Sequence, residues 1–101
     1  MNTTTTQLSF EEFRTQALAQ GCDEVLERRW APDAVVGEHN HPFTTSALVV
    51  QGEFWLTYEG SERHLQPGDR FHVEAKVPHS ERYGAEGATF WVGRRHGAQS
   101  A

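Results

Sequence analysis

The sequence predicts an all-β protein: a jelly-roll (double-stranded β-helix) barrel with one short N-terminal α-helix. Eight or nine short runs have the character of strands, turn residues separate them at roughly even spacing, and only one stretch has helical spacing. At 101 residues the chain fits one domain with one hydrophobic core. The alternative architecture is a plain β-sandwich without a cavity. The predicted strands cover residues 25–30, 35–41, 46–50, 54–58, 63–66, 70–73, 79–83 and 88–94.

The helix is predicted over residues 10–20. Ser9 and Glu12 have the spacing of a capping box, and Gly21 is a plausible stop. Four apolar residues within this stretch recur at helical spacing, so we expect a lid on the barrel or a dimer contact. The apolar residues are Phe10, Phe13, Ala17 and Leu18. The chain then divides into a disordered N-terminus (1–8), one barrel domain that includes the helix (9–95) and a loose tail (96–101).

Turn signals separate the later strands. Gln51-Gly52-Glu53 predicts a tight turn, and Glu59-Gly60 predicts a hairpin. Pro67-Gly68-Asp69 predicts another turn. Gly84-Ala85-Glu86-Gly87 is expected to separate the last two strands.

Composition narrows the possible partners. Nine basic and fourteen acidic residues give a net charge of −5, which argues against a nucleic-acid-binding surface. The single Cys22 cannot form an internal disulfide. No signal-peptide pattern or long apolar run is present, so the sequence predicts a cytoplasmic protein with no membrane partner.

Two histidines one residue apart offer a chelating arrangement. In a strand, His39 and His41 project to the same side, where two imidazoles can share one divalent ion. Zinc usually takes three or four protein ligands and iron commonly takes a facial set of three, so the chain must supply at least one more. His79, in the segment Val77-Pro78-His79 after the turn at 67–69, is the candidate third ligand.

These residues together resemble the two sequence motifs of the cupin superfamily. The matching features are the His39-Asn40-His41 pattern, Gly52, the Pro67-Gly68-Asp69 turn and His79, within a resemblance that covers residues 33–95. The resemblance implies a small single-domain cupin barrel. It also implies one divalent transition-metal ion (Zn, Fe, Mn, Ni or Cu) bound by His39, His41 and His79.

The sequence departs from the family pattern at several positions. The family's usual glutamate ligand falls at Thr45, or at Ser46 under a longer spacing, so no carboxylate stands there. The first glycine of the first motif falls at Asp33 and an inner glycine of the second falls at Lys76. The resemblance therefore implies a three-histidine site without its usual acidic ligand.

Other residues are candidates for the surroundings of the ion. Glu81 lies two residues beyond His79 and shares its face in a strand, where it could bind the ion, act as a base or orient an imidazole. Glu81 and Tyr58 are the candidate proton carriers, although no catalytic residue is assigned. We expect the pocket to be lined by Thr45, Phe43, Trp55, Phe71, His72 and Trp91.

Three functions are open at this point. The leading prediction is a metal-binding barrel that takes a small organic ligand in an aromatic-lined pocket. The second, also implied by the resemblance, is a metal-dependent dioxygenase, isomerase or decarboxylase with a small anionic substrate. The third is an interaction or dimerisation module with vestigial histidines. An exposed aromatic sheet in so short a chain predicts a homodimer.

Overall fold

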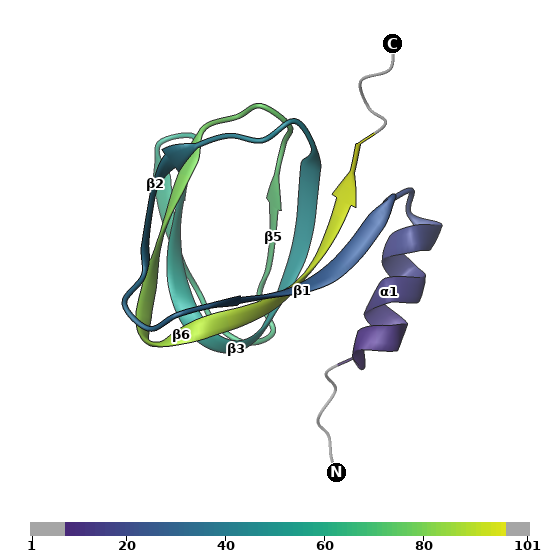
Figure 1. Ribbon diagram of the computed structural model, residues 1–101, viewed down its shortest axis with the longest axis horizontal. Coiled ribbons are helices and arrows are strands. Elements are labelled where there is room, and N and C mark those ends of the chain that lie inside the picture. The colour runs from purple at the N-terminus through teal and green to yellow at the C-terminus, as the bar shows by residue number, and fades with distance from the viewer. Residues whose placement is uncertain (1–7, 97–101) are drawn as a thin grey trace.

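The computed structural model describes residues 8–96 and is a barrel of antiparallel strands with one helix beside it (Figure 1). The predicted fold class is confirmed. The N-terminal residues 1–7 and the tail residues 97–101 lie outside the described chain, and with them most of the predicted disordered end and loose tail. The elements are α1 (Phe10–Ala19), β1 (Glu24–Trp30), β2 (Val35–His39), β3 (Thr44–Tyr58), β4 (Ser61–Leu65), β5 (Arg70–Val73) and β6 (His79–Arg95).

Strands β3 and β6 are much longer than the sequence predicts. Each contains two of the predicted strands, and the segments expected to turn, 51–53 and 84–87, instead remain extended. Those two turn predictions are wrong. The pairing of β3 with β6 shifts register between Val49 and Gln51 and again between Gly52 and Phe54, so each long strand bends at bulges without ending.

The two bent strands run through both layers of the barrel. The first half of β3 and the second half of β6 pair with each other and with β5 and β1. The second half of β3 and the first half of β6 pair with each other and with β4 and β2. The eight predicted strand segments thus form two four-stranded layers, which is the arrangement of a jelly roll.

The core lies between the two layers, and alternation along each strand selects the side chains that enter it. In β5, Phe71 and Val73 are buried while Arg70 and His72 are exposed. The same period-two pattern brings apolar side chains of β3 and β6 inward, because successive side chains of a strand point to opposite faces. The inner cluster consists of Ala47, Val49, Phe54, Leu56, Leu65, Phe71, Val73, Tyr83, Ala88, Phe90 and Val92.

Helix α1 packs on the outside of the barrel. Both hydrogen bonds of the Ser9–Glu12 capping box are present, as predicted. Phe13 and Ala17 are buried against Leu48 and Trp91 in a second apolar cluster, and Figure 1 shows the helix beside β1. The helix is therefore not a lid over the barrel. It is the one helix within residues 8–96, and it is neither long enough nor apolar enough to cross a membrane.

Candidate metal centre

The two segments that carry the three predicted histidine ligands lie side by side. His39 is the last residue of β2 and pairs with His79, the first residue of β6. His41 follows in the connection to β3, where the Lys76 backbone N–H donates a hydrogen bond of 2.7 Å to the His41 carbonyl. Backbone pairing thus brings together residues that are about forty positions apart in sequence.

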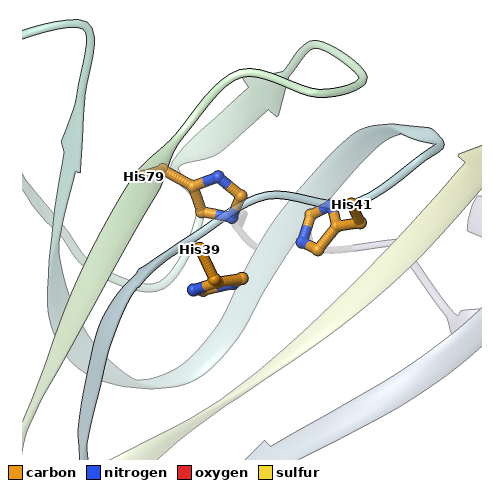
Figure 2. A group of neighbouring side chains, drawn as sticks. All are labelled: His39, His41 and His79. Carbon is orange, nitrogen blue, oxygen red and sulfur yellow. The ribbon is translucent and has the colours of Figure 1, made fainter.

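The three imidazoles point toward one another (Figure 2). Ring centroids are separated by 4.4 Å (His39 to His79), 4.7 Å (His41 to His79) and 5.3 Å (His39 to His41). One ligand nitrogen from each ring lies within 4.8 Å of the others. This spacing brings all three nitrogens within reach of a single ion after small side-chain rotations.

Backbone carbonyls orient two of the rings. Nδ1 of His39 donates to the Gly37 carbonyl at 2.8 Å, and Nδ1 of His79 donates to the Val77 carbonyl at 3.0 Å. A carbonyl can only accept, so in the neutral imidazole the free lone pair is on Nε2. Histidines that bind metals usually make this type of hydrogen bond through their other ring nitrogen.

The third ring, His41, is held in its neutral form. Burial lowers the pKa of His41 to about 4, with further lowering from the neighbouring His79 and His39 and from Arg94. At neutral pH one ring nitrogen of His41 is therefore unprotonated and available to an ion. Stacking of His41 on Phe43, with centroids 4.5 Å apart, fixes its plane.

The histidines open onto a cavity of about 170 Å³ inside the barrel. Its walls combine the three histidines with apolar side chains and a few charged ones. This volume is close to that of the engineered cavity of about 150 Å³ that admits benzene, so it suits a molecule of that size. The lining residues are Arg28, Trp30, His39, His41, Phe43, Thr45, Leu56, Phe71, Val73, His79, Glu81, Phe90, Val92 and Arg94.

Two arginines in this cavity were missed by the sequence predictions. Arg28 and Arg94 each belong to an Arg-Arg pair, and in each pair alternation turns only the first residue inward. Among the lining residues of the described chain, two arginines stand against one carboxylate, Glu81, in a chain whose net charge is −5. Arg94 also has a carboxylate partner outside the lining, because its Nη1 lies 3.5 Å from Glu24 Oε1. Alternation could have identified Arg94, because it lies two residues after Val92 and four after Phe90, which both point inward.

Unpartnered polar groups also concentrate at this cavity. Within residues 8–96, three buried side-chain polar atoms have no hydrogen-bond partner: Trp30 Nε1, His41 Nδ1 and Arg94 Nε. All three residues line the cavity. Trp30 Nε1 and Arg94 Nε are N–H donors, and a buried donor without an acceptor is costly. A bound acceptor would remove that cost.

Three of the six predicted pocket residues line the cavity, and three do not. Phe43, Thr45 and Phe71 are in its wall. Trp55 lies on the outer face, stacked on His64 at 4.5 Å with Arg82 over its ring at 4.3 Å. His72 is exposed and hydrogen-bonds Ser46 and Glu74.

Trp91 packs beneath helix α1, where its Nε1–H donates to Glu27 at 3.1 Å. The physical reason for all three outward positions is alternation, since each follows or precedes an inward residue of the same strand. Of the two candidate proton carriers, Glu81 lines the cavity. Tyr58 does not, and its hydroxyl accepts a hydrogen bond from the Glu74 backbone N–H at 3.1 Å.

The comparisons with known proteins agree with the fold. A family model described as "Cupin domain" matches residues 26–92. No curated protein sequence matches the chain significantly.

Among solved structures, KdgF from Halomonas sp. is 25% identical with a TM-score of 0.60, and the match covers 69% of this chain and 66% of that one. An RmlC-like cupin from Shewanella frigidimarina is 24% identical with a TM-score of 0.61, over 69% of this chain and 63% of that one. An oxalate decarboxylase from Bacillus subtilis is 25% identical with a TM-score of 0.65, over 75% of this chain and 21% of that one. The chain spans less than two thirds of the length of each of these proteins. The match to the family model covers well over half of the sequence, and the chain belongs to the cupin domain family.

Proposed function

We propose that this cupin binds one divalent transition-metal ion through His39, His41 and His79, and a small organic anion in the adjoining cavity. The observation that carries the proposal is the convergence of three imidazoles, one ligand nitrogen from each within 4.8 Å of the others, on the wall of a cavity that is also lined by two arginines. Neutral imidazole is the most common protein ligand for such ions.

The donor set suits first-row transition-metal ions and zinc. Three imidazole nitrogens suit Zn, Fe, Ni or Cu, and Mn where oxygen ligands complete the shell. When bound, the ion supplies Lewis-acid polarisation of a ligand oxygen. The protein's own contribution is to orient His39 and His79 through backbone carbonyls and to keep His41 neutral.

The anionic character of the organic ligand follows from the cavity wall. Arg28 and Arg94 bring two permanent positive charges, and the Nε–H of Arg94 and the indole N–H of Trp30 lack acceptors. A carboxylate supplies acceptor oxygens and a negative charge together. The apolar wall formed by Leu56, Phe71 and Phe90 would contact the rest of the molecule.

A second candidate function is a metal-dependent enzyme acting on such an anion. It is favoured by the position of Glu81, a carboxylate in the cavity wall beside two of the histidines. One similar structure is an oxalate decarboxylase, and another is described among DMSP lyases. A homodimer and a cytoplasmic location remain predictions from the sequence.

The metal part of the proposal is tested by elemental analysis of protein purified without an affinity tag. We expect about one equivalent of a transition metal per chain, its removal by a chelator, and a higher Tm when the ion is restored, because a ligand that binds only the folded state stabilises it. Protein that contains no metal and shows no change in Tm with any of the five ions would contradict it.

The ligand part is tested by Arg94→Met in metal-loaded protein. We expect the affinity for two- to five-carbon carboxylates, measured by calorimetry, to fall about 10- to 100-fold, since hydrogen bonds to charged groups contribute about 1.5–3 kcal/mol. Arg29→Met is the matched control, because that side chain is 77% exposed and pairs with Glu27 on the outer face. The amides of the same acids should bind weakly to the wild type. Equal carboxylate affinity in Arg94→Met and the wild type would refute the assigned anion contact.

A further inference from the structure

Glu81 occupies a position in which a carboxylate needs a positive partner. It lies on β6 two residues after His79, on the same face, and its side chain is only 11% exposed. The Tyr83 hydroxyl donates a hydrogen bond of 2.6 Å to Oε1. Tyr83 itself is buried, so this contact fixes the orientation of the carboxylate.

The second carboxylate oxygen faces two imidazole nitrogens. Oε2 lies 3.6 Å from Nε2 of His79 and 3.8 Å from Nε2 of His39. Both distances are too long for hydrogen bonds. Because the Nδ1–H groups of these rings are donated to backbone carbonyls, each neutral ring turns a lone pair, not a proton, toward the site. Three potential ligand atoms, Oε2 and the two Nε2 atoms, thus face one another.

The described chain has no lysine or arginine partner for the negative charge of Glu81. Within residues 8–96, no arginine or lysine nitrogen lies within 4 Å of the Glu81 carboxylate. A carboxylate withdrawn from water is costly unless it is paired with a positive group. A divalent ion placed where Oε2 and the two Nε2 atoms converge would supply that positive charge.

We infer that Glu81 is the fourth ligand of the metal ion, an inference that rests on the proposed function. Donor atoms about 2.0–2.2 Å from a tetrahedral ion lie about 3.4 Å apart, so Oε2 is within a few tenths of an ångström of this separation from the Nε2 atoms of His79 and His39. The ligand nitrogen of His41, which lies within 4.8 Å of those of the other two rings, would have to move closer when the ion binds. The carboxylate that the family pattern places at Thr45 is thereby supplied from β6, with Tyr83 holding its other oxygen. Thr45 contributes a neutral hydroxyl to the cavity wall.

The inference is tested by Glu81→Gln, which keeps the shape of the side chain and removes its charge. We expect the affinity for Zn²⁺, measured by competition with a chromophoric chelator, to fall about 100-fold. Loss of an outer hydrogen-bond partner of a ligand typically costs 10- to 100-fold. Tyr83→Phe, which removes only the hydrogen bond, should lower the affinity about 10-fold. Loading with Co²⁺ provides a second readout, because its visible spectrum changes when a carboxylate ligand is lost.

The matched control is Glu38→Gln. This residue precedes His39 on β2, is exposed, and loses the same charge on the opposite face of the strand. It should retain wild-type Zn²⁺ affinity and the wild-type Co²⁺ spectrum. The metal-free variants should have the far-UV circular dichroism of the metal-free wild type, which separates loss of a ligand from loss of the fold.

Two outcomes would overturn the inference and can be told apart. If wild-type protein binds no ion, the proposed function and the inference fail together. If the wild type binds Zn²⁺ but Glu81→Gln binds it equally tightly with an unchanged Co²⁺ spectrum, only the inference fails. In that second case Glu81 would be free to act as a proton carrier.

Discussion

His41→Ala is expected to abolish stoichiometric metal binding while leaving the barrel folded. Removal of one of three imidazoles takes away a direct bond to the ion, so the affinity should fall by at least about 100-fold, the upper end of the effect of losing an outer hydrogen-bond partner. The fold should persist because His41 lies outside both apolar clusters and its Nδ1 has no hydrogen-bond partner to lose. Metal content by elemental analysis and circular dichroism measure the two effects.

The matched control for this variant is His72→Ala. It removes the same side chain from the outer face of β5, where His72 contacts Ser46 and Glu74 and does not line the cavity. We expect its metal content to equal that of the wild type. Equal metal content in His41→Ala and the wild type would contradict the ligand assignment, and loss of metal in both variants would indicate a general effect on folding.

The convergence of the three histidines could be predicted because it depends on spacings that can be read directly from the sequence motifs. His39 and His41 are two residues apart, and His79 follows a turn at a fixed distance. The pocket lining was predicted less well. Phe71 and His72 were both assigned to the cavity, although neighbouring residues of one strand cannot share a face. Consistent use of alternation would have excluded His72 and selected Arg94.

The bends of the two long strands could not be predicted from local signals. Glycine, glutamine and glutamate at 51–53 are typical of a tight turn, and the same residues suit a bulge within a continuing strand. What decides between them is pairing with the partner strand, which is a long-range property. Two positions where the family sequence pattern has glycine have a left-handed backbone in this chain: Asp33 and Lys76 have φ of 59° and 68°. Asp tolerates this region, whereas Lys is strained in it.

Gly52→Ala is expected to cause a large loss of stability, because the glycine lies at a bend of β3 where there is no room for a side chain. Gly52 has φ of +75°, and a Cβ added there would lie 2.1 Å from the Gly87 carbonyl oxygen and 2.8 Å from the Ala88 Cα. Both obstacles are backbone atoms of the paired strand β6, which cannot rotate away. The left-handed conformation costs about 1–2 kcal/mol for an L-residue, and overpacking adds about 1–3 kcal/mol. The free energy of unfolding should therefore fall by about 3 kcal/mol.

Gly60→Ala separates the two contributions. Gly60 has a similar φ of +82°, but an added Cβ would have no atom within 4 Å. Urea denaturation should show a loss of about 1 kcal/mol for Gly60→Ala, from backbone conformation alone. If Gly52→Ala lost no more than Gly60→Ala, close contact between β3 and β6 at the bend would not be what fixes Gly52. A larger loss for Gly52→Ala would mean that this glycine allows β3 and β6 to pass together from one layer of the barrel to the other. That passage matters for the site, because His79 and Arg94, near opposite ends of β6, both line the cavity.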